Sequence, residues 1–165
     1  MSLFDRFITW MDNRGSSRMI TRLENGKPKN YIKRHYILQL PFMTVLLHQF
    51  WTSDPDDLHD HPWSNIKIRI KGSYYEYDAQ GNKFKRDKWY VGYRQAEVFH
   101  RIEVDPGMEG KVWSLFVHFK RKRAWGFLKG NKWIPASEYE NPVEVHGRNF
   151  KIEGTFFPRY VKLGA

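Results

Sequence analysis

Short segments with the alternation of a β-strand fill most of the chain between His35 and Ile134. Residues 66–71 (Ile-Lys-Ile-Arg-Ile-Lys) alternate apolar and polar side chains strictly, and Gly72 follows them. Similar runs cover residues 35–40, 43–51, 74–78, 83–90, 92–94, 97–104, 111–120, 123–128 and 132–134, many of them separated by Gly, Pro or Asn. Many short strands with closely spaced turns are typical of an antiparallel sandwich or barrel. We therefore predict an all-β fold.

The rest of the chain is expected to decorate this barrel within a single domain of residues 1–165, with a core at about 31–134. The pair Ser2 and Asp5 has the spacing of a capping box, and apolar residues follow at helical intervals, which predicts a short amphipathic helix over residues 3–12. This helix packs on an open face of the domain or makes a homodimer contact. The extension 135–165 lacks strong periodicity; it wraps the barrel, adds an edge strand near residues 149–153, or contacts a partner.

Charge and composition limit the partners. Lys and Arg total 28 against 18 Asp and Glu, a net charge of +10, which favours anionic partners such as nucleic acid or phosphorylated metabolites, or else only a solubilising surface. No apolar run approaches the roughly 18 residues of a membrane span, and no signal peptide is recognisable, so we expect a cytoplasmic protein without a membrane contact. The absence of Cys excludes disulfides and thiolate metal sites, leaving nitrogen and oxygen ligands.

Two histidines one residue apart, His59 and His61, precede the strand at 66–71. In an extended strand, residues i and i+2 point to the same side, so both imidazoles can reach one metal ion. His100, in the predicted strand at 97–104, ranks first as a third ligand. The other candidates are His35, His48, His118 and His146. We expect His48 and His118 to be core residues, because they lie in apolar strands.

Five short motifs occur in a fixed order: Leu58–Trp63 (LHDHPW), Gly72–Glu76 (GSYYE), Tyr93-Arg94, His100-Arg101-Ile102 and Arg123–Phe127 (RAWGF). Together they resemble a group of small cupin-like, cysteine-dioxygenase-like proteins of bacteria and their phages, over roughly residues 31–128. The resemblance implies a cupin double-stranded β-helix, which is a jelly-roll barrel, with one metal ion inside. His59, His61 and His100 match its ligands. Asn65 stands where cupins carry a glutamate ligand, so a three-histidine site is implied; Glu76 is an acidic alternative.

Strand parity suggests a substrate site beside this metal. Without a β-bulge after His61, Asn65, Lys67 and Arg69 share the inward face with the histidine pair, and Arg94 has the parity of His100. We expect these four residues, with Glu76, to line a site for an anionic group. A bulge would instead turn Lys67 and Arg69 into solvent. Asp60 points away from the metal and either orients a neighbouring loop or a ligand imidazole, or is a surface carboxylate.

The resulting functional hypothesis is a mononuclear iron dioxygenase-like enzyme that acts on a small, anionic substrate. Iron(II) is the first choice of divalent ion, with Zn, Mn and Ni as alternatives. A metal-dependent isomerase or hydrolase would use the same ligands. The alternative from another class is a non-catalytic cupin module that binds a nucleotide, a sugar or a nucleic-acid component.

Overall fold

A computed structural model describes residues 1–24, 27–139 and 143–146. The elements in chain order are α1 (Leu3–Asn13), β1 (Ser17–Glu24), β2 (Lys27–Leu40), β3 (Met43–Phe50), β4 (Leu58–His59), β5 (Asn65–Lys71), β6 (Tyr74–Asp78), β7 (Lys83–Arg86), β8 (Val91–Arg94), β9 (His100–Glu103), β10 (Val112–Phe119), β11 (Gly126–Lys129), β12 (Lys132–Pro135) and β13 (Val143–His146). No helix in these ranges is long and apolar enough to span a membrane.

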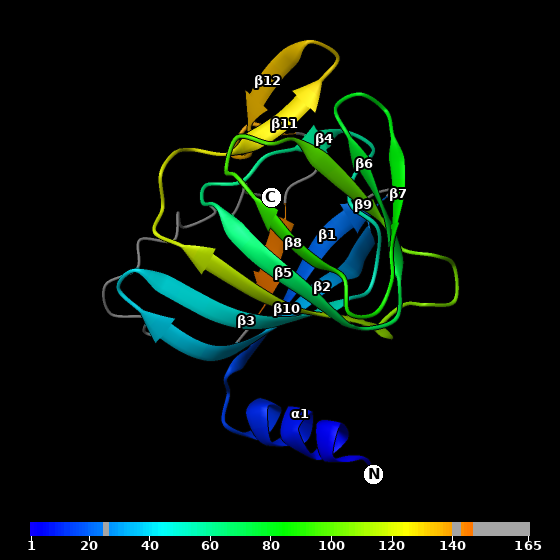
Figure 1. The fold of residues 1–165 in the computed structure, drawn as a ribbon, viewed down its shortest axis with the longest axis vertical. Helices are drawn as coiled ribbons and strands as arrows, with labels where there is room; N and C mark the ends of the chain where they lie inside the picture. The colour runs from blue at the N-terminus through cyan, green and yellow to red at the C-terminus, as the bar shows by residue number, and fades with distance from the viewer. Residues whose placement is uncertain (25–26, 140–142, 147–165) are drawn as a thin grey trace.

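The strands form two antiparallel sheets. One sheet has seven strands in the order β13-β1-β2-β3-β10-β5-β8, and the other has six in the order β12-β11-β4-β9-β6-β7 (Figure 1). Eight of these strands pair as nested hairpins: β3 with β10, β4 with β9, β5 with β8, and β6 with β7. This nesting is the strand order of a jelly roll, the architecture of cupins. The all-β jelly-roll prediction is confirmed.

The bend between β5 and β6 shows why a glycine follows the strand at 66–71. Gly72 has a φ of 72°, in the left-handed region that L side chains rarely adopt. A Cβ at this position would also lie 3.1 Å from the Cα of Val112 on β10. The chain therefore turns here from one sheet to the other at a point where only glycine fits easily.

The predicted N-terminal helix is confirmed as α1. The Asp5 N–H donates to Ser2 Oγ at 3.1 Å, and the Ser2 N–H donates to Asp5 Oδ2 at 3.0 Å, which completes the capping box. The helix lies against the outside of the barrel (Figure 1). Phe4 packs edge-on to Trp113, with ring centroids 5.0 Å apart, and Lys33 donates to Asp12 Oδ2 at 2.7 Å. The alternative of a dimer contact through this helix stays a prediction.

The structure differs from the predicted strands in several places. β1 was not predicted, and β2 begins at Lys27 rather than at His35. Charged residues in both strands hide the alternation of apolar and polar side chains by which a strand is recognised. The predicted strand at 83–90 ends at Arg86. Trp89 then adopts a φ of 70° in the turn before β8. An edge strand is present at β13, paired with β1; the predicted one at 149–153 lies outside the described residues.

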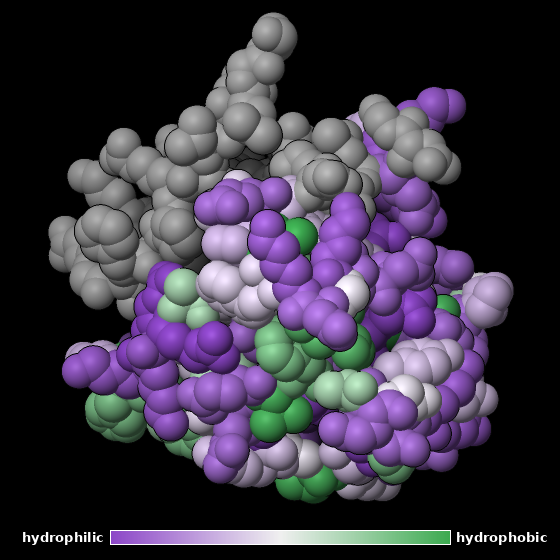
Figure 2. All heavy atoms as spheres, turned by 90° about the horizontal axis from the view of Figure 1, so that it is seen from above, coloured by the Kyte–Doolittle hydropathy of each residue, from purple (hydrophilic) through white to green (hydrophobic). Residues whose placement is uncertain are grey.

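The barrel interior is partly apolar and partly polar. One buried apolar cluster has residues from both sheets: Ile20, Ile32, Phe50, Tyr74, Ile102, Val104 and Val112. A smaller cluster lies within the seven-stranded sheet and consists of Tyr36, Leu46 and Phe116. Buried polar side chains, among them Asn65, Lys67, Arg69 and Glu76, occupy much of the remaining interior. The outer surface is mainly hydrophilic on the face drawn in Figure 2, where apolar residues form a smaller group. Buried polar side chains in this number point to a functional interior.

Candidate metal centre

Three histidines meet inside the barrel. His59 ends β4 and lies directly opposite His100, the first residue of β9. His61 follows β4 in a loop that is held to the neighbouring segment by a hydrogen bond from the His61 N–H to Ala96 O, 2.9 Å long. One ligand atom from each of the three residues lies within 4.8 Å of the others. Of the seven histidines in the sequence, the structure therefore gathers the three that the cupin resemblance implies as ligands.

The spacing of the imidazoles suits a single small cation. His61 Nε2 and His100 Nε2 are 2.7 Å apart, and the three pairs of ring centroids are 4.6, 5.0 and 5.1 Å apart. Two nitrogens bound at about 2.1 Å and at a right angle to one another would be roughly 3 Å apart. Small shifts of the rings would therefore allow all three nitrogens to bind one ion.

Burial keeps the three imidazoles neutral. It lowers the pKa of His59, and it lowers the pKa of His61 and of His100 well below the ordinary value of 6.5. Positive neighbours, Lys67 and Arg94, act in the same direction. A neutral imidazole is the form that binds metal ions, so the cluster can bind a cation at neutral pH without first losing protons.

Carboxylates stand behind two of the rings. His100 Nδ1 is 2.9 Å from Glu76 Oε1, although the angle falls outside hydrogen-bond geometry, and His59 Nδ1 is 3.7 Å from Asp54 Oδ2. Metal-binding histidines commonly direct their second nitrogen at a carboxylate, which orients the ring. The two carboxylates are therefore placed to orient His100 and His59.

Asp54 is a residue that the sequence reasoning missed. It is buried, and its Oδ2 accepts the Ile102 N–H at 2.6 Å while its Oδ1 accepts the hydroxyl of Tyr31. These bonds hold the carboxylate beside His59. The segment Asp54-Pro55-Asp56-Asp57 contains three aspartates with no pattern that would distinguish the buried one, because its partners come from β2 and β9.

Glu76 is the centre of an ion-pair network rather than a member of the histidine cluster. Its side chain is buried, and its carboxylate accepts hydrogen bonds from Lys67 Nζ, from Arg94 Nη2 at 2.5 Å and from Arg86 Nε at 2.9 Å. Burial alone would raise the pKa of Glu76, but Lys67 and the neighbouring bases hold it well below its ordinary value. The carboxylate is therefore ionised and already shared among three cations.

Lys67 and Asn65 lie inside the barrel as predicted, because within β5 their positions are buried and the isoleucines are only partly exposed. The continuous strand that the prediction assumed is wrong, since residues 60–64 separate β4 from β5 and the two strands belong to different sheets. Burial lowers the pKa of Lys67 to about 8 despite the opposing effect of Glu76, which leaves the amine charged at neutral pH. Both side-chain amide atoms of Asn65 are buried without a hydrogen-bond partner in the described part of the chain.

Arg69 and Arg94 have different surroundings. Arg94 lies opposite Asn65 on the neighbouring strand and pairs with Glu76, close to the histidines. The Arg69 guanidinium instead lies 3.7 Å above the ring of Tyr74 and donates from Nη1 to Trp113 O at 3.3 Å. Of the five residues predicted to line a substrate site, Lys67, Arg94 and Glu76 thus surround His100, whereas Arg69 occupies a separate part of the interior.

Asp60, between the two histidines, faces away from them and is completely buried. Its carboxylate accepts the Gly126 N–H at 2.7 Å and the Trp133 indole N–H at 3.2 Å, and it pairs with Arg123 at 2.9 Å. The interpretation as a surface carboxylate is therefore wrong. Asp60 orients the β11–β12 hairpin, which lies at the end of the barrel opposite α1 (Figure 1).

The other histidines whose side chains the structure describes lie outside the cluster. His35 Nδ1 lies 2.7 Å from Ser17 Oγ under α1. His48 stacks on Phe116 with centroids 4.5 Å apart, and His118 stacks on Trp63 at 4.1 Å. His146 lies on β13, opposite Met19 on β1. The expectation of a core residue agrees with the burial of His48, whereas His118 is only partly buried.

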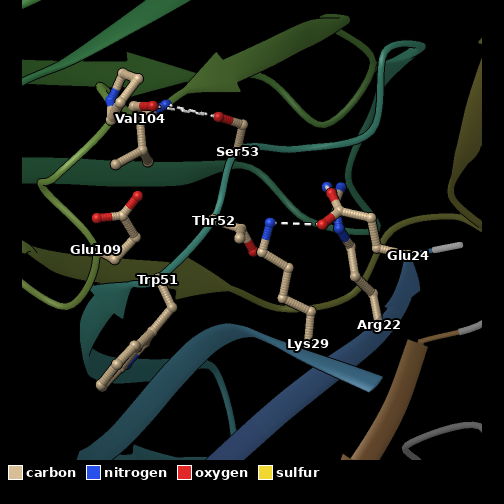
Figure 3. Close-up of a pocket in the computed structure, with 9 residues that line it drawn as sticks. Arg22, Glu24, Lys29, Trp51, Thr52, Ser53, Val104 and Glu109 are labelled. Carbon is tan, nitrogen blue, oxygen red and sulfur yellow. Dashed lines mark hydrogen bonds and ion pairs between the residues drawn. The ribbon is translucent and has the colours of Figure 1, made fainter. Parts of the chain in front are cut away.

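A separate surface pocket of about 150 Å³ is lined by Arg22, Glu24, Lys29, Trp51 and neighbouring residues (Figure 3). Glu24 accepts hydrogen bonds from Arg22 at 3.0 Å and from Lys29 at 2.5 Å, so the two cations already have a counterion. None of the three clustered histidines lines this pocket. It is distinct from the candidate metal centre.

No protein-family model and no curated protein sequence matches the chain. Its structure is similar to that of iron(II) HppE (15% identity, 62% of this chain and 56% of that chain, TM-score 0.48). It is also similar to KdgF from Halomonas sp. (14%, 55% and 82%, 0.46) and to the polyketide cyclase RemF from Streptomyces resistomycificus (14%, 56% and 68%, 0.48). The chain thus spans little more than half of the length of HppE. The assignment as a cupin-type jelly roll rests on its own strand order.

Proposed function

We propose that this chain is a metal-dependent cupin enzyme that holds one divalent ion, with iron(II) as first choice, through His59, His61 and His100. The observation that supports the proposal best is the placement of three neutral imidazoles, two of them buried and that of His61 half-buried, with their ligand atoms within 4.8 Å of one another. Imidazole nitrogen suits iron and also zinc, nickel or copper, while manganese prefers oxygen ligands. The donor set therefore fits a mononuclear centre, with zinc and nickel as the better matched alternatives to iron and manganese as the least well matched of the predicted ions.

When bound, iron(II) held by three protein nitrogens would supply open positions for a small substrate and for dioxygen. The protein residues around it have separable roles. Asp54 and Glu76 orient the rings of His59 and His100. Lys67 and Arg94 neutralise Glu76 and keep its carboxylate beside His100. The barrel walls limit the access of water to these residues.

The proposed substrate is a small anionic molecule, and dioxygenation is the proposed reaction. The charges around Glu76 support this substrate class, because three cations, Lys67, Arg86 and Arg94, share its single carboxylate. Asn65 adds an amide whose donor and acceptor are both free to orient a ligand, as far as the described residues show. A phosphate or carboxylate group would balance the excess positive charge.

Metal content tests the proposal directly. The purified full-length protein is loaded anaerobically with iron(II), desalted and measured by elemental analysis. We expect about one ion per chain in the wild type and a large loss in His59→Ala, His61→Ala and His100→Ala, since each removes a ligand. His118→Ala is the matched control, because it removes a histidine that stacks on Trp63 outside the cluster. Dioxygen uptake with small carboxylates and phosphates then tests the reaction.

The outcomes separate the two classes of function. Equal metal loss in His118→Ala and in the ligand variants would contradict the proposed centre. A protein that binds no metal but does bind phosphorylated ligands would instead support the non-catalytic module.

A further inference from the structure

A row of polar side chains crosses the inner face of the seven-stranded sheet. Ser114 on β10 is paired with His48 on β3 to one side and with Arg69 on β5 to the other. Arg34 on β2 continues the row, opposite His48. Residues paired directly across strands share a face of the sheet, and neighbouring strands are about 5 Å apart. The face is the inner one, because Arg69 lies over Tyr74 of the opposite sheet.

The nitrogens of this row lack partners. Arg69 is 1% exposed, yet its Nε and Nη2 have no hydrogen-bond partner among the described residues, and the same holds for His48 Nε2 and Arg34 Nε. No carboxylate in the described ranges lies within 4.0 Å of the Arg69 or Arg34 guanidinium. By contrast, Lys67, Arg86 and Arg94 all pair with Glu76. A buried charge without a paired counterion is unfavourable, so an anion bound to the row would stabilise it.

The free edge of Arg69 has the right shape for an oxyanion. Its Nη1 is used by Trp113 O, while Nε and Nη2, which lie side by side on the guanidinium, are the unpartnered pair. Two parallel N–H donors of this kind match the two oxygens of a carboxylate or phosphate. Tyr74 covers one face of the guanidinium and fixes its plane. The arginine is therefore held in place with its bidentate edge unused.

We propose that Arg69, together with His48 and Ser114, forms a buried binding site for an oxyanion, namely the carboxylate or phosphate group of a small ligand. Arg34 adds a second positive charge at the far end of the row. The site needs no metal ion. Arg69 lies two residues beyond Lys67 on β5, which places its Cα roughly 7 Å further from the residues that surround His100.

His48 was predicted to be only a core residue, and its surroundings explain its place in the site. Burial, followed by the charge of Arg34, lowers the pKa of His48 well below 6.5, so the imidazole is neutral. In that form it can donate a single hydrogen bond from Nε2 to an anion. Its stacking on Phe116 at 4.5 Å holds the ring at the edge of the polar row.

Anion-dependent thermal stability tests the proposal. The melting temperature of the full-length protein is measured in inorganic phosphate, sulfate and acetate, each compared with chloride at equal ionic strength. A ligand at 100 times its Kd raises the melting temperature of a domain of this size by about 5 to 10 °C. We expect a rise of this order with phosphate or acetate in the wild type; the more effective anion identifies the oxyanion class.

Arg69→Met and Arg6→Met are a matched pair of variants, since both exchange an arginine for an unbranched apolar residue. Arg6 is exposed on α1, outside the row. We expect Arg69→Met to lose the anion-dependent rise and to be at least as stable as the wild type in chloride, because it removes an unpaired buried charge. Arg6→Met should keep the rise. An equal rise in Arg69→Met and the wild type, or no rise in the wild type above chloride, would overturn the proposal.

Two further variants keep the test decisive. His48→Phe preserves the stack on Phe116 and removes one hydrogen-bond donor. The phosphate concentration that gives half of the maximal rise in melting temperature should therefore increase about tenfold. An unchanged concentration would contradict the proposal even if Arg69→Met does not fold. His59→Ala removes a proposed metal ligand and should leave the phosphate effect intact. Loss of the effect in His59→Ala would place the anion at the histidine cluster, which overturns this inference but not the proposed metal centre.

Discussion

Replacing Glu76 by Gln perturbs the most heavily shared charge in the barrel. The substitution keeps the shape of the side chain but removes the carboxylate that Lys67, Arg86 and Arg94 share. The side chains of Glu76, Lys67 and Arg94 are only 2%, 7% and 11% exposed, so water cannot replace the lost charge easily. Removing one partner of a buried ion pair costs about 3–5 kcal/mol. We expect Glu76→Gln to lower the free energy of unfolding by about 4 kcal/mol and the melting temperature by roughly 8–16 °C.

Urea unfolding followed by tryptophan fluorescence measures this loss. The comparison includes Lys67→Met and the double variant Lys67→Met/Glu76→Gln, which forms a double-mutant cycle. We expect the double variant to be destabilised by less than the sum of the single variants, because removing both charges leaves fewer of them unpaired. Glu103→Gln is the control: Glu103 pairs with Lys83 at 2.9 Å, but both side chains are well exposed, so its loss should cost under about 1 kcal/mol.

The pH dependence sharpens the test. The pKa of Lys67 is already lowered to about 8 by burial, and loss of Glu76 lowers it further. Between the folded and unfolded pKa values the unfolded chain binds more protons than the folded one, so stability rises with pH. Glu76→Gln should therefore recover part of its deficit as the pH is raised from 7 to 9. The reasoning is refuted if Glu76→Gln costs no more than Glu103→Gln, or if the double-mutant cycle is strictly additive.

Three other perturbations follow from the same structure. Asp60→Asn should lower the free energy of unfolding by about 3 kcal/mol, since the hairpin that includes Trp133 loses its buried carboxylate; urea unfolding showing a loss below about 1 kcal/mol would contradict this. Gly126→Ala would place a Cβ 2.1 Å from Ile134 O, so we expect a loss of about 1–3 kcal/mol and faster amide exchange in β11 and β12; unchanged exchange would argue against it. Burial lowers the pKa of His35 to about 4, so the folded chain holds this imidazole neutral where the unfolded chain protonates it. The free energy of unfolding should therefore fall by up to about 3 kcal/mol between pH 6.5 and pH 4. His35→Phe should reduce this dependence of stability on pH.

The strands and the inward residues of β5 could be predicted because both follow from neighbouring residues. Alternation with period two put Asn65, Lys67 and Arg69 on one face of β5, and the structure shows that this face is the buried one. The spacing of His59 and His61 pointed to a shared site, although His61 lies in the loop after β4 rather than on a strand. Bringing His100 to them required the ordered motifs and their resemblance to cupins, since no local pattern connects β4 with β9.

The charge balance of the interior could not be predicted in this way. Alternation made Lys67, Arg69 and Arg94 equivalent candidates for binding an anion, whereas the structure pairs two of them with Glu76 and leaves Arg69 unpaired. Asp54 was hidden among three aspartates of one loop. In each case the deciding partner lies on a different strand.

The sequence by itself determined the β character of the chain, its helix at residues 3–12, and which side chains of β5 share a face. The tertiary structure alone decided which buried charges meet. Ser114 lies between His48 and Arg69 only because β10 inserts between β3 and β5 in this register. A shift of two residues in that register would keep every hydrophobic pattern and every inward face, yet it would place different polar groups side by side. Local patterns record which face a residue takes, whereas register between distant strands decides its neighbours.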